Sequence, residues 1–127
     1  MSKASEAIFS RPFTPKTEIV STPEWGPDAP MVEIRELTSD QLERWEWRTA
    51  RRRDSSRGRD VHFRASAIIE AAFLPGGEKL LVRKDVELLA KQGGAAIIRL
   101  YAAFRRTNGL DEEQPDQEEP EITPPAA

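Results

Sequence analysis

Hydrophobic and polar positions change their period several times along the chain, and each change marks an expected element. Residues 31–37 alternate, with Val32 and Ile34 on one face and charged side chains between them, which is the period of a half-buried strand. Residues 16–22 predict a second short strand. The intervening residues 23–30 are dense in proline and glycine, as loops are. The pattern therefore predicts an antiparallel hairpin that needs a helix to pack against.

Helical spacing begins at Thr38. Its hydroxyl can accept a hydrogen bond from the Gln41 N–H while the Gln41 side chain bonds back, which is a reciprocal N-terminal cap. A helix is therefore expected over residues 38–53. A second helix is expected over residues 60–73, where apolar residues at helical spacing cover nearly every side, as in a central buried helix. A strand around residues 68–69 remains the alternative.

Two shorter patterns complete the helical part. Asp85 is placed to cap a helix over residues 86–92. The last helix is expected over residues 95–107, with two arginines in its final turn, where cations interact favourably with the helix dipole. Asn108 and Gly109 then supply a left-handed stop. The residues expected to face the core from the shorter helix are Val86, Leu88 and Leu89.

The 127 residues are expected to form one domain with a tail at each end. Residues 1–15 contain two prolines and little periodicity, which predicts a flexible segment. Residues 16–110 should form a mainly α domain of about four helices with a short N-terminal β-hairpin. Residues 111–127 contain seven acids, no bases and four prolines, so they cannot bury enough apolar surface to offset the entropy of ordering. They predict a disordered acidic tail.

Composition narrows the class of protein. The chain has no cysteine, which excludes disulfides and thiolate metal sites. Its first residues lack the apolar run of a signal peptide. The most apolar window, residues 65–74, contains Glu70 and is too short to span a bilayer. A cytosolic protein that does not enter a membrane is expected.

Candidate chemistry is sparse. His62 is the only histidine, and no motif brings carboxylates to it, so we expect it on a helix surface or at the edge of the core. Residues 75–77 (PGG) lack the pattern of a phosphate-binding loop. The paired acids lie in the expected tail, where a mobile backbone cannot hold catalytic geometry. The sequence predicts a protein that is not an enzyme and holds no cofactor or metal.

Basic residues concentrate in one stretch. Outside residues 111–121 the chain carries 15 acids against 19 Lys and Arg. An arginine cluster with nearby tryptophans could bind phosphates and stack on bases, as in a nucleic-acid-binding protein. We favour the alternative that the cluster forms a solvated face; a third possibility is that it grips a protein partner. The cluster consists of Arg44, Arg48, Arg51, Arg52, Arg53, Arg57, Arg59 and Arg64.

All three tryptophans lie in the first 50 residues. Trp25, in the hairpin loop, is expected to act as a lid over the contact between hairpin and helix. Leu42 and Trp45 share the apolar stripe of the first long helix, whereas Trp47 lies off it. Because aromatic side chains are common anchors of protein interfaces, we expect Trp47 to be exposed and functional.

The ordered set of these motifs resembles the tail assembly chaperones of long-tailed bacteriophages. The resemblance covers about residues 16–113. The chain departs from the family pattern in the arginine-rich residues 51–59 and in the PGG turn, where an acidic turn is commoner. The matching segments are residues 23–26 (PEWG), 32–38 (VEIRELT), the apolar run 65–74, the glycines 76–77, 85–89 (DVELL) and 108–110 (NGL).

The resemblance implies a non-catalytic protein of the host cytoplasm, not expected in the mature virion. It would bind the tape measure protein and keep it soluble until tail tube protein polymerises around it. A longer frameshifted form could recruit tail tube protein, and self-association is possible. The alternatives are a small nucleic-acid-binding accessory protein and a structural tail or connector protein. The candidate client-binding residues are Leu42, Trp45, Trp47, Phe63, Phe73, Tyr101 and Phe104.

Overall fold

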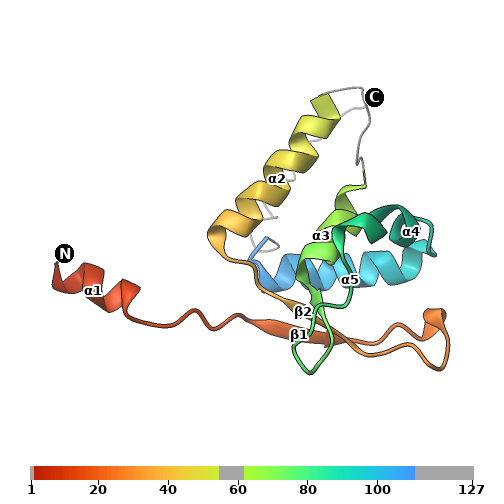
Figure 1. Ribbon diagram of the computed structural model, residues 1–127, viewed down its shortest axis with the longest axis horizontal. Helices are drawn as coiled ribbons and strands as arrows, with labels where there is room; N and C mark the ends of the chain where they lie inside the picture. Colours follow the sequence, from red (N-terminus) through yellow and green to blue (C-terminus); the bar gives the residue numbers. More distant parts are fainter. Residues whose placement is uncertain (1, 55–61, 111–127) are drawn as a thin grey trace, which may run out of the picture.

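The computed structural model describes residues 2–54 and 62–110, and side chains for 2–49 and 62–110 (Figure 1). The predicted acidic tail and most of the arginine-rich connection lie outside these residues. In the described part the fold is mixed α/β, with five α-helices and a three-stranded antiparallel sheet. The elements are α1 (Lys3–Phe9), β1 (Thr17–Val20), the 3-10 turn η1 (Pro23–Trp25), β2 (Val32–Arg35), α2 (Ser39–Asp54), α3 (Phe63–Ala71), β3 (Ala72–Phe73), the 3-10 turn η2 (Arg83–Asp85), α4 (Val86–Ala90) and α5 (Gly94–Thr107).

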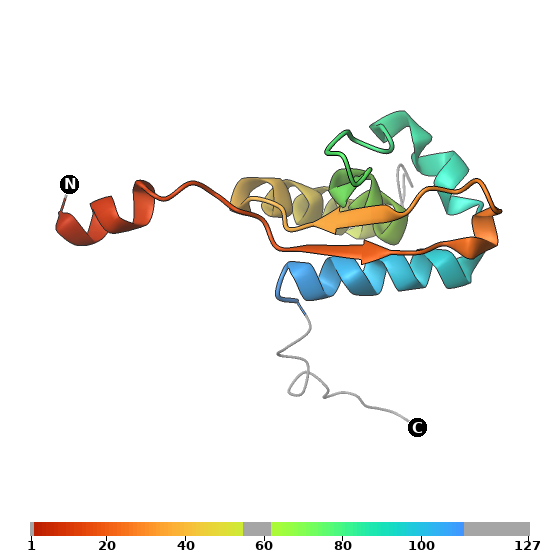
Figure 2. The ribbon, with the colours of Figure 1, turned by 90° about the horizontal axis from the view of Figure 1, so that it is seen from below.

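The sheet confirms the predicted hairpin and adds a third strand. Its order is β1-β2-β3, with Val20 opposite Val32 and Glu33 opposite Phe73. Val32 and Ile34 are fully buried against the helices. Figure 2 shows the face of the sheet that points away from α2 and α3, with the strands in front of these two helices. The alternation along β2 therefore arises because only one face of the sheet is covered.

The third strand corrects the mainly α prediction. Residues 72–73 were expected to end the second helix, but they leave it and pair with β2. A two-residue strand is too short to produce a period of its own, so only the tertiary pairing defines it. The central helix itself is confirmed as α3, in which Ala67 and Ile68 have no exposed surface.

The two capped helix ends are confirmed by their hydrogen bonds. At the start of α2, the Thr38 N–H donates to Gln41 Oε1 at 2.9 Å and the Gln41 N–H donates to Thr38 Oγ1 at 3.3 Å. At the end of α5, Gly109 has φ +69° and the Leu110 N–H donates to the Arg105 carbonyl at 2.8 Å. This is the left-handed stop that the sequence predicts.

Asn108 joins these two ends. Its Oδ1 accepts a hydrogen bond from the Leu37 N–H at 2.9 Å, and its Nδ2 donates to the Phe104 carbonyl at 2.9 Å. The turn from β2 into α2 is thereby tied to the last turn of α5, across 71 positions of sequence.

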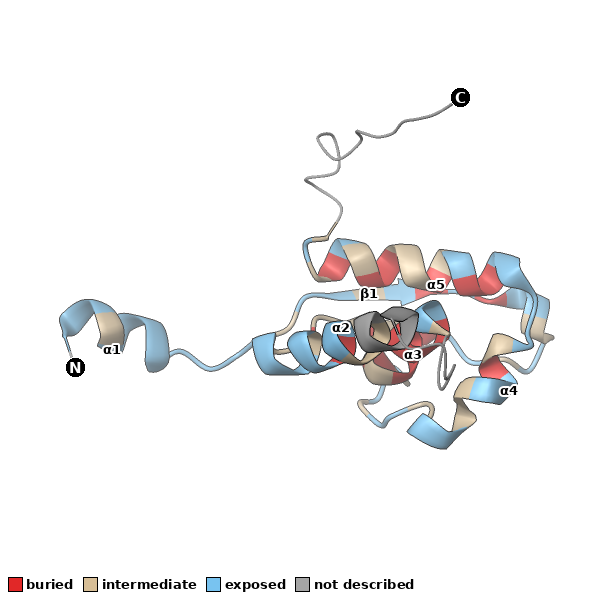
Figure 3. Ribbon diagram, turned by 90° about the horizontal axis from the view of Figure 1, so that it is seen from above, coloured by how far each residue is buried: buried red, intermediate tan, exposed pale blue. Residues whose placement is uncertain are grey.

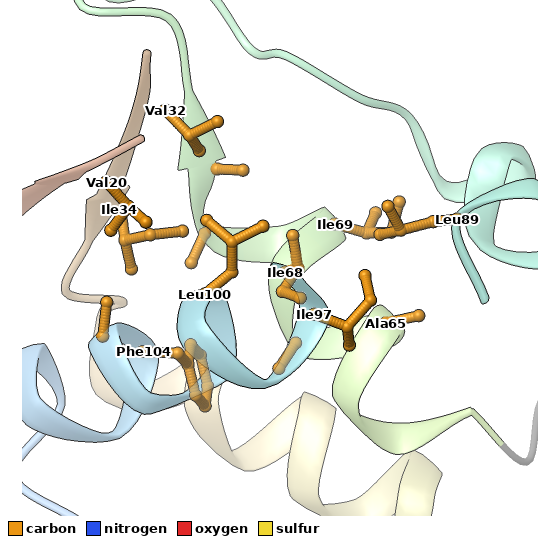
Figure 4. Packing of buried hydrophobic residues seen from close by; sticks show 14 of the residues in the cluster. Val20, Val32, Ile34, Ala65, Ile68, Ile69, Leu89, Ile97, Leu100 and Phe104 are labelled. Carbon is orange, nitrogen blue, oxygen red and sulfur yellow. The ribbon is translucent and has the colours of Figure 1, made fainter. Parts of the chain in front are cut away.

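The core lies between the sheet, α3 and α5. Figure 4 shows Leu100 pointing toward Ile34 and Ile68, and all three side chains are fully buried.

At the end of α3, the Lys79 ammonium donates to the carbonyls of Ile69 at 2.6 Å and Glu70 at 3.2 Å, which satisfies two acceptors that the helix leaves open. Burial lowers the pKa of Lys79.

Residues 3–9, within the segment expected to be flexible, form the short helix α1. Two local predictions are wrong. Leu88 was assigned to the core but is 67% exposed, whereas Leu89 is buried. The Asp85 carboxylate accepts from the Val82 N–H at 2.9 Å and so caps η2 rather than α4. Whether Leu88 or Leu89 faces the core depends on what packs against α4, which the periodicity of a five-residue helix does not reveal.

An exposed ion pair fastens the hairpin loop to α5. The Arg99 guanidinium donates to Glu24 Oε1 at 3.0 Å and to the Ser21 carbonyl at 3.1 Å. The hydrogen bonds from Arg99 lower the pKa of the Glu24 carboxyl to about 2.

No helix in the described part of the chain is long and apolar enough to cross a bilayer.

We expect the stabilisation of the hairpin loop by the Arg99–Glu24 ion pair to depend on pH. Because the folded pKa of Glu24 lies below its ordinary value of 4.5, the stabilisation is complete above pH 4.5 and is lost as the pH falls toward 2. We expect an NMR titration of the Glu24 carboxyl to show a midpoint near 2, and R99Q to return it toward the ordinary value. An unchanged midpoint in R99Q would contradict this assignment.

Candidate functional site

Four of the seven candidate client-binding residues form one aromatic cluster that joins α2, α3 and α5. The Phe104 ring lies 5.0 Å from Trp45, edge to face, and 5.7 Å from Tyr101, stacked. Tyr101 in turn meets Phe63 at 5.8 Å. The Trp45 indole N–H donates to the Phe63 carbonyl at 3.2 Å. These offset and edge-on geometries are the favourable ones for aromatic pairs.

Burial divides this cluster into an inner and an outer part. Trp45 and Phe104 are buried, so they belong to the core and are not available to a client. Phe63 is 40% exposed and Tyr101 is half-buried, so these two form the accessible end. Leu42 packs against the edge of the core. The helical stripe that identified Leu42 and Trp45 thus indicates core packing.

Trp47 and Phe73 lie on two other surfaces. Trp47 is 61% exposed on the outer face of α2, which confirms its predicted exposure. Phe73 lies on the uncovered face of the sheet, where the Arg35 guanidinium lies 4.2 Å from its ring centroid and the Lys79 ammonium 5.2 Å. The structure therefore does not gather the seven candidates into one surface.

The three arginines of the cluster whose side chains are described interact with the protein itself. Arg44 pairs with Asp40 at 3.2 Å, one helical turn away. Arg48 pairs with Glu70 at 3.2 Å. Arg64 lies over the rings of Phe63 and Tyr101, 4.9 and 5.8 Å from their centroids. The side chains of Arg51, Arg52, Arg53, Arg57 and Arg59 lie outside the described part.

Sequence reasoning missed an apolar groove beside α4. The groove has a volume of about 350 Å³ and is lined by Trp25, Leu81, Leu88 and Leu89, with Asp85 and Gln92 as its polar residues. We call it the α4 groove. Figure 3 shows α4 as a short helix with one buried position and an outer side open to solvent. Because α4 has only five residues, its sequence could not show which leucine faces outward.

A second hollow adjoins the α4 groove. It measures about 230 Å³, and Gln92 lines both. Phe63 and Arg64 contribute to it from α3, and Ala90 and Ile97 from α4 and α5. We call it the Phe63 hollow. His62, which directly precedes α3, also lines it, and its Nε2 lies 3.5 Å from Glu87 Oε1.

Together the α4 groove and the Phe63 hollow form a mostly apolar surface with a few polar groups. Such a surface suits the apolar face of an amphipathic helix, whose side chains can enter neighbouring hollows. Among the residues that the structure describes, no three His, Asp or Glu side chains gather closely enough to hold a metal ion. In comparisons with known proteins, no family model, curated protein or solved structure matches this chain.

Proposed function

We propose that the protein is a non-catalytic tail assembly chaperone that binds exposed apolar helical segments of the tape measure protein. The observation that carries this proposal is the α4 groove, where Leu88 is 67% exposed beside the partly buried Trp25. An exposed leucine next to an apolar hollow suits a partner that buries both. The resemblance to tail assembly chaperones supplies the identity of that partner.

The residues that carry the resemblance also build this surface. Trp25 comes from the PEWG segment and lines the α4 groove from the hairpin loop. Asp85, Leu88 and Leu89 come from the DVELL segment and line it from α4. Two motifs separated by about sixty residues therefore meet at one groove, which supports a shared binding role.

The size of the surface suits reversible binding. Two small open hollows bury little area per contact, so affinity would come from many modest contacts along a long client. A chaperone that must later be displaced by polymerising tail tube protein needs this property. The client would stay soluble because its apolar helical faces are covered in the meantime.

The proposal predicts that L88S weakens client capture. Losing a leucine side chain from an apolar contact removes about 1.5–3 kcal/mol, which is about tenfold or more in affinity. We would express tagged wild-type and L88S chains in infected cells, treat the lysates with nuclease, wash at high salt and quantify the captured proteins by mass spectrometry. The matched control is I98S, which removes a similarly exposed aliphatic side chain from α5, outside both hollows.

Three other outcomes would contradict the proposal. Equal capture by L88S and wild type would show that the α4 groove does not bind the client. Capture that disappears with nuclease, with abundant nucleic acid before treatment, would favour the arginine cluster as a nucleic-acid site. Detection of the protein at stoichiometric copy number in purified particles would favour the role of a structural connector.

A further inference from the structure

The N-terminal arm, residues 2–15, stands away from the body of the protein. Figures 1 and 2 show α1 at the end of an extended segment, well apart from the sheet and the other helices. No residue of α1 is buried. Ile8, Phe9 and Phe13 are between 53% and 70% exposed. This places three large apolar side chains within six residues on a projecting segment.

Such an arm needs a surface to cover it. Isolated helices much shorter than about 12 residues are marginal in water, because few hydrogen bonds offset the entropy of nucleation. Helix α1 has seven residues, and its N-terminal cap is the Ser2 hydroxyl, which accepts a hydrogen bond from the Ser5 N–H. A cap contributes only about 1 kcal/mol. Burial of Ile8 and Phe9 against a partner would supply the missing stabilisation.

The outer face of α2 offers a matching surface. A broad hollow of about 760 Å³ is lined there by Trp47, Asp40, Glu43, Glu46, Arg44 and Arg48. We call it the Trp47 hollow. Arg44 pairs with Asp40, and Arg48 pairs with Glu70 of α3. Glu43 and Glu46 thus give the rim around the exposed Trp47 ring an acidic character.

The charges of the arm and the hollow are complementary. The arm carries two bases, Lys3 and Arg11, against the single acid Glu6. It therefore combines apolar side chains with positive charge, as the Trp47 hollow combines an exposed aromatic ring with carboxylates. Complementary charges of this kind set the register of a contact and speed its formation.

We propose that the N-terminal arm of one copy docks in the Trp47 hollow of a second copy. Ile8 and Phe9 cover the Trp47 ring, while Lys3 and Arg11 face Glu43 and Glu46. Residues 10–15 are not helical, and six extended residues reach about 20 Å, enough to carry α1 onto a neighbour. Reciprocal exchange of two arms closes a dimer, and one-way docking builds a chain of copies.

This inference is independent of the proposed function, because the Trp47 hollow and the α4 groove share no lining residue. We expect light scattering after gel filtration to show self-association that weakens as salt is raised, since salt screens exposed charges. Reversing the rim charges with E43K/E46K should weaken association about tenfold or more. Combining this variant with K3E/R11E chains should restore it, whereas L88S should leave it unchanged.

A cross-link tests the contact directly, because the chain has no cysteine of its own. One tagged copy carries A7C on α1, and a differently tagged copy carries S39C, one turn before Glu43 on α2. A short bis-maleimide should join the two tagged copies, and I8S/F9S in the arm should abolish the product. The proposal would be overturned if the wild-type protein stayed monomeric at all concentrations and the two tagged copies gave no cross-linked product. Salt-independent association that survives deletion of residues 2–15 would also overturn it.

Discussion

F104A is expected to lower the free energy of unfolding by about 3–5 kcal/mol. Phe104 has no exposed surface, and its ring contacts both Trp45 and Tyr101. The variant would lose the buried apolar area and leave a cavity where α2 and α5 meet. Urea unfolding monitored by tryptophan fluorescence measures this loss, because Trp45 itself reports on the site.

The matched control is F63A at the outer end of the same aromatic cluster. Phe63 is 40% exposed and makes a single aromatic contact, with Tyr101. We expect F63A to cost clearly less than F104A, since water already reaches the Phe63 ring. Equal losses in the two variants would contradict the division of the cluster into a buried and an accessible part. Small domains have only about 5–15 kcal/mol of stability, so F104A is also expected to raise the unfolded fraction at equilibrium.

N108A is expected to cost about 1–3 kcal/mol, because it leaves the Leu37 N–H without its acceptor in a partly buried position. The Phe104 carbonyl loses a donor in the same variant. Two measurements check this: the free energy of urea unfolding, and the hydrogen exchange rate of the Leu37 amide, which should rise.

N108D separates the two bonds of Asn108. A carboxylate still accepts from the Leu37 N–H but cannot donate to the Phe104 carbonyl at neutral pH. We therefore expect N108D to keep the Leu37 amide protected while losing part of the stability. Fast exchange of the Leu37 amide in N108D, equal to that in N108A, would show that the bond to Oδ1 does not hold this turn.

Local patterns predicted the elements whose cause is local. The alternation of Val32 and Ile34, the Thr38–Gln41 cap and the stop at Gly109 can each be recognised from a few neighbouring residues. All three are present in the structure. The short strand β3, by contrast, depends on pairing with β2, some forty residues earlier in the chain. No period in two residues could have revealed it.

The candidate site shows the same division. Trp47 was placed outside the apolar stripe of its helix, and its exposure follows from that spacing alone. Trp45 and Phe104 were also candidate client-binding residues, but both are buried where α2 packs against α5. Leu88 looked like core and is exposed, because the hairpin loop and η2 leave its side of α4 open.

The sequence by itself determined the hairpin, the order of the main helices, the Thr38–Gln41 cap, the stop at Gly109 and the exposed Trp47, since these follow from propensity and periodicity within each segment. Only the tertiary structure decided the third strand, the aromatic core, the α4 groove and the bond from Asn108 to Leu37. Each of these joins segments far apart in the chain. Their contacts form only when whole elements pack, and the free energy of that packing is a property of the assembled core rather than of any one segment.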